Sequence, residues 1–403
     1  MATTETMRAK ERSTRSEDAP DLLVCLPPLR PDALDATIAT LSNVFANGNV
    51  LVACPDAAPR LPANSALEVV SFTPTAPVAN YWVHTAADFL NAYKLAAEHN
   101  APAVLLLGAE PESLSAAAIE ALATAVTGGA CDLAIPHYAL GPFEGMVNSG
   151  ILYPLTRSLF GVSARFPLAV DLGVSLRMAE RLATAAQEHT AAGNNEAIVW
   201  PGAEAAVAGF IIQQVEAGAR SVPHPVGSDL NTILTLIGSS IFADVEAKAA
   251  FWQRSRPSQF GTVPTPSNAP AQAAAPPDVG GMIDTFRLAF TNLHQIWSLV
   301  LPPNSLLGLK HLSLMPAETF RMPDALWARI VFDFVLAYRL RTINRGHLLG
   351  ALTPLYLAWV ASFVIQVNGG ADAEVRIEEI ETAFEADKPY LVSRWRWPDR
   401  FNP

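Results

Sequence analysis

The sequence predicts a doubly wound, mostly parallel α/β sheet followed by an all-helical C-terminal domain. Short apolar runs alternate with helical segments in the first half, which is the pattern of parallel strands joined by crossover helices. A stretch rich in Pro, Ala, Ser and Gln follows at 254–280, and beyond it the apolar residues recur about every 3.6 positions. We therefore predict an α/β domain at 21–253, a linker or loop at 254–280 and a helical domain at 281–403.

Composition narrows the class of partner. The 403 residues are 50% apolar and 16% charged, with a net charge of -11 and no basic stripe, which excludes a nucleic-acid partner. The three cysteines lie in or beside apolar runs, so we expect buried, reduced thiols and a cytoplasmic protein. Residues 1–20 are polar and lack the apolar core of a signal peptide, so we expect a disordered tail.

The α/β domain begins with five apolar runs that predict buried strands. Ligands of such sheets bind at the carboxyl ends of strands, which points to 55–56, 108–112 and 137–145. The predicted strands are 21–27, 49–55, 66–73, 103–109 and 132–138, and the predicted helices between them are 32–46, 84–99 and 115–126.

The second half of this domain is predicted from weaker patterns. A helix at 150–159 leads through a turn to Asp171, which lies beside Gly173 just before another helix. The later elements are predicted as a helix at 175–190, a strand at 197–200, a helix at 204–214, a strand at 219–225 and a helix at 229–252. The helical domain is predicted as helices 282–301, 324–344, 348–367 and 373–386.

The helix at 348–367 is long enough to cross a bilayer. Its twenty residues carry no charge, and about 20 apolar residues span a membrane. It also contains Pro354 and several polar residues, and it follows another amphipathic helix. We therefore interpret it as a buried core helix and expect no membrane association.

The segment from 135 to 178 carries a family resemblance. It contains, in order, Tyr138, Glu144-Gly145, Asn148, Tyr153-Pro154-Leu155-Thr156-Arg157 and Pro167-Leu168-Ala169-Val170-Asp171. This arrangement resembles the GT-A-type retaining nucleotide-sugar glycosyltransferases around mannosylglycerate synthase and glucosyl-3-phosphoglycerate synthase. The resemblance covers nearly the whole chain after the tail, and it implies a GT-A fold with a helical C-terminal domain.

The resemblance implies a role for several side chains. Asp171 matches an acid that lies close to the donor sugar, so it is the candidate catalytic residue, with Asp56 and Tyr138 on the donor and nucleotide side. Glu204 and Asn148 would serve the acceptor side. Other interpretations stay open from the residues alone: Asp171 can cap the following helix, Asp56 can be a turn residue, and Glu204 can be an acid at a helix N-terminus.

The metal-binding motif of these transferases departs from the family pattern. Their Asp-x-Asp falls at Gly108-Ala109-Glu110, so Glu110 is the candidate metal ligand, and His224 is a second, displaced by two residues. Glu110 and Glu112 can equally begin the next helix. The resemblance implies a divalent metal, Mg or Mn, if the protein is active, and no cofactor otherwise.

Two further departures lie in the donor motifs and leave two functions open. The family's Gly-Lys-Gly falls at His84-Thr85-Ala86, and its Gly-Gly falls at Ala169-Val170. One function is transfer of a hexose from a nucleotide sugar to a small, glycerate-type acceptor with retention. The alternative is a catalytically inactive, glycosyltransferase-like scaffold that binds a protein partner or a second copy of itself.

Overall fold

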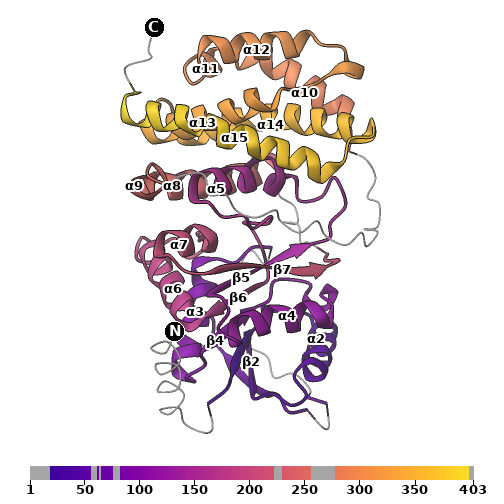
Figure 1. Cartoon of the computed structure of the whole chain (residues 1–403), viewed down its shortest axis with the longest axis vertical. Helices are drawn as coiled ribbons and strands as arrows, with labels where there is room; N and C mark the ends of the chain where they lie inside the picture. The colour runs from indigo at the N-terminus through magenta and orange to yellow at the C-terminus, as the bar shows by residue number, and fades with distance from the viewer. Residues whose placement is uncertain are drawn as a thin grey trace. The chain divides into compact units, whose positions relative to one another are not determined.

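The computed structural model describes residues 19–55, 61–62, 65–75, 82–221, 229–255 and 277–398. These residues form two compact units, and neither is one continuous stretch of chain. The first unit takes residues up to 136 together with 169–199 and 210–223, and the second takes 137–168, 200–209 and the chain from 224 onward. Figure 1 shows the elements of both units.

A seven-stranded sheet in the order β3-β2-β1-β4-β6-β5-β7 organises the first unit. The strands β3, β2, β1 and β4 pair in parallel, and β6 pairs antiparallel with β4 and β5. The predicted class, a mostly parallel sheet with helices, is therefore confirmed. The strands are β1 (Leu22–Cys25), β2 (Val50–Pro55), β3 (Glu68–Phe72), β4 (Ala103–Leu106), β5 (Leu133–Tyr138), β6 (Leu172–Ser175) and β7 (Ile212–Gly218).

Burial explains why these runs became strands. Every residue of β2 and β4 is buried, as expected for parallel strands that are covered on both faces. Helix α2 packs against α4, and α3 packs against α6. Figure 1 shows these two pairs on opposite sides of the sheet. The helices are α2 (Pro31–Val44), α3 (Ala86–Glu98), η1 (Pro111–Ser113), α4 (Ala116–Thr127) and α6 (Leu176–Ala191).

The strand β6 corrects the prediction for the segment after Asp171. The sequence predicted a turn leading into a helix, but Leu172–Ser175 forms an antiparallel strand between β4 and β5. Only four residues long and interrupted by Gly173, the run is too short to show a strand pattern. The helix after it is capped by Ser175, whose hydroxyl accepts from the Met178 amide, so Asp171 is not its cap.

The last strand also differs from the prediction. Helix α7 (Pro201–Ala208) ends at Gly209, whose φ of 70° takes the left-handed conformation that glycine tolerates. The strand that follows is Ile212–Gly218, so the helix predicted at 204–214 ends too late. The strand predicted at 219–225 is wrong at 219–221, and its remaining residues lie outside the described residues. The predicted strand at 197–200 is only an isolated bridge between Ile198 and Thr85.

The second unit is helical in its described residues. Within it, α14 packs against α8, α10 and α13, and α15 packs against α5 and α13. The helix predicted at 282–301 is divided in two, and α12 was not predicted. Its helices are η2 (Asn148–Leu152), α5 (Tyr153–Phe160), α7, α8 (Leu230–Ala247), α9 (Ala249–Trp252), α10 (Val279–Asn292), α11 (His294–Ser298), α12 (Pro303–Leu314), η3 (Ala317–Thr319), α13 (Asp324–Leu340), α14 (Arg345–Asn368) and α15 (Ala373–Arg396).

The units do not follow the predicted domain limits. Helices α8 and α9, which the sequence assigns to the α/β domain, belong to the same compact unit as the C-terminal helices. Most of the predicted linker and nearly all of the predicted N-terminal tail lie outside the described residues. The boundary at 253–281 stays a prediction.

Within the described residues, two helices are long and apolar enough to cross a membrane by length and composition. The most apolar window of Arg345–Asn368 is 83% buried inside the structure, and that of Leu230–Ala247 is 33% buried. A core helix passes the same test, and α14 has the burial of a core helix: side chains from Leu348 to Val364 are covered almost without interruption.

Candidate functional site

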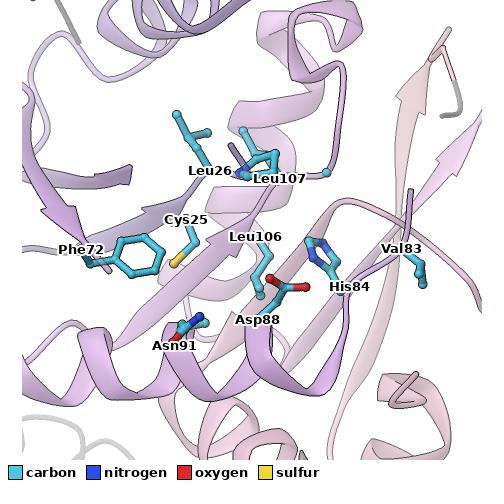
Figure 2. A pocket seen from close by; sticks show the side chains of 12 residues that line it. Cys25, Leu26, Phe72, Val83, His84, Asp88, Asn91, Leu106 and Leu107 are labelled. Atoms are coloured by element: carbon cyan, nitrogen blue, oxygen red, sulfur yellow. The ribbon is translucent and has the colours of Figure 1, made fainter. Parts of the chain in front are cut away.

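The carboxyl ends of β1 and β4 frame a small cavity in the first unit. In the sheet β1 lies between β2 and β4, and the chain continues from β1 to β2, on the side away from β4. The carboxyl ends of β1 and β4 therefore form the topological switch point, where α/β proteins bind ligands. The cavity has a volume of about 40 Å³. Figure 2 shows Cys25, Phe72, His84, Asp88 and Asn91 around it.

The polar groups around the cavity already have partners. Asp88 forms a capping box with Thr85, whose amide and hydroxyl both donate to the Asp88 carboxylate. The side-chain oxygen of Asn91 accepts from Thr75. Burial, with the nearby Asp88 charge, raises the pKa of the Cys25 thiol, which makes it a poor nucleophile. The cavity has room for a few water molecules but not for a nucleotide.

His84, which lines the cavity, is hydrogen-bonded to Val170, the residue before Asp171. The His84 imidazole donates from Nε2 to the Val170 carbonyl oxygen at 2.6 Å. A β-carbon added to Gly108 would lie 2.6 Å from the Val170 Cβ, so the backbone after β4 touches Val170 directly. His84 and Val170 stand where the resemblance places glycines, and their hydrogen bond joins the segment before α3 to the segment before β6.

Asp171 follows Val170 and is completely buried. Its side chain is 0% exposed. One carboxylate oxygen accepts from the Gly108 amide at 3.0 Å, and the other accepts from Nε of Arg220 at 2.9 Å. A buried carboxylate needs a cation or several donors, and Asp171 has both. The carboxylate is therefore turned to the protein's own groups and away from solvent.

Glu110 is joined to the same arginine, but through its backbone. Its carbonyl accepts from Nη1 of Arg220 at 2.6 Å, and its carboxylate accepts from the Ser221 hydroxyl at 2.5 Å. The residue has a φ of 55°, a left-handed conformation that is uncommon outside glycine. The structure thus brings Asp171 and Glu110 together through Arg220, although their carboxylates have different partners.

The predicted site residues of the second unit each lie in a packed environment. Tyr138 is 3% exposed and packs on Phe166, with 5.2 Å between ring centroids. Asn148 accepts from the Leu168 amide at 3.1 Å. Glu204 pairs with the Lys248 ammonium at 2.8 Å.

Lys248 also pairs with Asp244, so one lysine serves two acids. Burial lowers the pKa of Lys248, but the Asp244 and Glu204 charges outweigh it and the net shift is upward. Burial raises the pKa of Asp244 to about 6, with a smaller contribution from Glu204 and an opposing one from Lys248. Glu204, which the resemblance assigned to the acceptor side, therefore belongs to an internal ion network.

Two of the predicted site residues, Asp56 and His224, lie outside the described residues. Among the residues that the structure does describe, no group of three or more His, Cys, Asp or Glu side chains has the geometry of a metal site. The three cysteines are free thiols.

The sequence reasoning missed Arg220. It lies in a short segment between β7 and residues 222–228, which the structure does not describe, and it looks like an ordinary surface residue there. A charged residue two positions after the strand β7 was the available signal. Its partner acid is 49 positions away in the sequence, and no local pattern links the two.

Comparison with known proteins gives a weak structural likeness. No protein-family model matches the chain, and no curated protein matches it. Two similar solved structures are complexes of glucosyl-3-phosphoglycerate synthase from Mycobacterium tuberculosis. One, with phosphoglyceric acid, is 15% identical and the other, with Mn²⁺, UDP and glucosyl-3-phosphoglycerate, is 16% identical. Both have a TM-score of 0.34, and the alignment covers 56% of this chain and 79% of theirs.

A third solved structure, described as a mycobacterial protein, is 13% identical with a TM-score of 0.35. That alignment covers 56% of this chain and 74% of the other. Likeness at this level carries no argument about function, so the function has to be inferred from the residues themselves.

Proposed function

We propose that this chain is a glycosyltransferase-like scaffold that does not transfer sugar and acts as a binding or assembly partner. The observation that carries the proposal is the state of Asp171. A carboxylate that holds a donor sugar has to face the ligand, whereas this one is fully buried and bonded to Arg220 and the Gly108 amide.

The packing around Asp171 supports the same proposal. Val170 contacts Gly108, and the His84 imidazole donates to the Val170 carbonyl. The cavity that His84 and Gly108 line has a volume of only about 40 Å³. A donor sugar would have to displace packed side chains and break a buried ion pair, which costs about 3–5 kcal/mol when one partner is left alone. The partner we propose is a protein or a second copy of this chain, and the compartment is the cytoplasm, where its thiols stay reduced.

Retaining transfer of a hexose to a glycerate-type acceptor is the competing proposal, and the sequence resemblance supports it. In that proposal Glu110 and a divalent metal hold the diphosphate, Asp171 contacts the sugar, and Glu204 and Asn148 contact the acceptor. The two proposals differ in whether a nucleotide sugar binds at the carboxyl end of β4.

Calorimetric titration tests the choice between them. The purified protein is titrated with UDP- and GDP-sugars, with and without Mg²⁺ or Mn²⁺, and each donor is also incubated with the protein to measure its hydrolysis. We expect neither binding heat nor turnover. Metal-dependent binding that Glu110→Ala abolishes, while Glu112→Ala leaves it intact, would overturn the scaffold proposal in favour of the transferase.

A further inference from the structure

The guanidinium of Arg220 is surrounded by oxygen atoms in the first unit. Its side chain is 0% exposed. Its three nitrogens donate to six oxygen atoms that come from four separate points of the chain. These are both carboxylate oxygens of Asp171, the carbonyl oxygens of Ala109, Glu110 and Ser221, and the hydroxyl oxygen of Ser113, at distances from 2.6 to 3.3 Å.

This set of donors is the kind that a hard cation selects. Carboxylate, carbonyl and hydroxyl oxygens are the ligands of Ca²⁺ and Mg²⁺ in proteins, and no nitrogen or sulfur atom accepts from the guanidinium in the contacts given above. Asp171 supplies one full negative charge, and the three carbonyls add their dipoles. The Glu110 carboxylate accepts from the Ser221 hydroxyl and adds a second negative charge nearby.

The backbone after β4 takes an unusual conformation that brings these oxygen atoms together. Glu110 is one of three non-glycine residues with a positive φ in the described chain, at 55°, and it follows β4 directly after Gly108-Ala109. That conformation lets the carbonyls of Ala109 and Glu110 converge on the same guanidinium. Backbone strain of this kind costs about 1–3 kcal/mol and persists only where the surroundings enforce it. The convergence is therefore a built feature and not a chance contact.

A divalent metal at this strand end would compete with Arg220 for the same oxygens. A metal ion at this strand end would need the oxygens of Asp171, Ala109 and Glu110, and the guanidinium already binds all three residues. A divalent ion on the same oxygens would lie within a few ångströms of the guanidinium, where like charges repel strongly in a buried space. The residues present do not fit a divalent metal while Arg220 is in place.

We propose that this oxygen set is a cation site that the chain fills with its own Arg220 in place of a bound metal ion. The arginine supplies the positive charge that the buried Asp171 requires, and it organises the turn after β4 as a metal would. The inference is incompatible with a transferase that holds a divalent metal at these oxygens, but it does not otherwise depend on the proposed function.

Removing the arginine tests the proposal. The variant Arg220→Ala leaves the oxygen set without a cation, so we expect it to melt below the wild type and to regain stability with millimolar guanidinium, Ca²⁺ or Mn²⁺. At a ligand concentration about a hundred times Kd, the melting temperature should rise by about 5 °C. Wild type should show no such rise. In the double variant Arg220→Ala/Asp171→Asn the rise should disappear.

Arg177→Ala is the matched control. Arg177 also pairs with a single aspartate, Asp132, through two nitrogens, but its side chain is 62% exposed. Among the described residues its guanidinium hydrogen-bonds to Asp132 and to no backbone carbonyl. Added cations should not stabilise this variant. If the Arg220→Ala protein is stable but neither guanidinium nor a divalent ion raises its melting temperature, the oxygens are not a cation site.

A measurement on the wild-type protein covers the case in which Arg220→Ala does not fold. Titration of wild type with Mn²⁺, followed by electron paramagnetic resonance, should show no bound ion that depends on Asp171. Bound Mn²⁺ that the variant Asp171→Asn releases would mean that the site takes a metal beside Arg220, and this result would overturn the proposal.

Discussion

Gly108 and Val170 are in direct contact at the end of β4: a β-carbon on Gly108 would lie 2.6 Å from the Val170 Cβ and 2.7 Å from its carbonyl oxygen. The first contact involves a side chain, but the second involves backbone that the His84 imidazole also holds through a hydrogen bond. A glycine is therefore required here by close approach of two chain segments. This contact joins the turn after β4 to the segment before β6.

The variant Gly108→Ala should be destabilised by about 1–3 kcal/mol, since overpacking forces one segment to move. Adding Val170→Ala should recover only part of the loss, because the carbonyl contact remains. Urea unfolding measures both. Gly48→Ala is the control, since a β-carbon there would meet its nearest neighbour at an ordinary 3.5 Å. Full recovery in the double variant would show that the backbone contact is unimportant.

Asp132 joins three elements of the first unit and should make stability depend on acid pH. It is 4% exposed and accepts from Arg177, the Ser175 hydroxyl and the Ile211 amide. Burial raises the pKa of its carboxyl, but these hydrogen bonds, led by that from Arg177, outweigh it and hold the pKa below its ordinary value.

Because the folded pKa is lowered, the stabilisation by Asp132 is present above the unfolded value of about 3.9 and is lost as the pH falls below it. We expect Asp132→Asn to cost about 1–3 kcal/mol near neutral pH and to flatten the acid limb of the stability curve. Urea unfolding from pH 2.5 to 7 measures this. Asp35→Asn, at an exposed position of α2, makes the same charge change and should do neither.

Gly150 lies where the packing of the second unit leaves no room for a larger side chain. It lies in the π-helical turn Asn148–Leu152 just before α5, where the sequence predicted the start of an ordinary helix. A β-carbon on Gly150 would lie 2.3 Å from Cζ3 of Trp359, and its carbonyl accepts from the Trp327 indole at 2.6 Å. The two indoles are stacked with centroids 5.8 Å apart, so Trp359 has little freedom to move away.

We expect Gly150→Ala to cost about 3 kcal/mol or to prevent folding of this unit. Thermal unfolding followed by tryptophan fluorescence reports on it directly, because both indoles lie at the site. Gly280→Ala is the matched control, since the nearest atom to its added β-carbon is 3.6 Å away. Equal melting temperatures for Gly150→Ala and wild type would contradict this packing.

The sequence predicted the central strands because their apolar runs are buried on both faces. β1, β2, β4 and β5 fall inside the predicted ranges, and so does most of α14. Short or interrupted runs were not recognised: β6 has four residues with Gly173 among them, and α12 has no clear apolar face. Where an element is held mainly by its neighbours, its own sequence has little pattern to read.

The candidate site was only partly predictable for a related reason. Asp171 and Glu110 were singled out by the family resemblance, but the group that binds both is Arg220, 49 and 110 positions away from them in the sequence. Contacts at such separations depend on the order of strands in the sheet. In the sheet, β6 and β5 lie between β4 and β7, yet the segment after β7 reaches the turn after β4, and no local pattern indicates this.

Asp333 is the buried acid of α13 and should give stability the opposite pH dependence to Asp132. It is 2% exposed, one of its oxygens accepts from the Tyr390 hydroxyl at 2.6 Å, and the other has no hydrogen-bond partner among the described residues. Burial raises the pKa of its carboxyl to about 7, against the opposing effects of the Tyr390 hydroxyl and of Arg329 and Arg394.

Since this folded pKa lies above the unfolded value of about 3.9, the folded state binds the extra proton between roughly pH 4 and 7. The free energy of unfolding should therefore fall as the pH rises through that window, by on the order of 1 kcal/mol per pH unit, and level off above it.

The variant Asp333→Asn should remove this slope. It should also have a higher free energy of unfolding than wild type at pH 8, since the amide needs no proton. Asp284→Asn, on the exposed face of α10 with a side chain 79% accessible, should keep the slope. Equal slopes for Asp333→Asn and wild type between pH 5 and 7 would mean that Asp333 is ionised in the folded protein, and Arg329 and Arg394 would then have to compensate its charge.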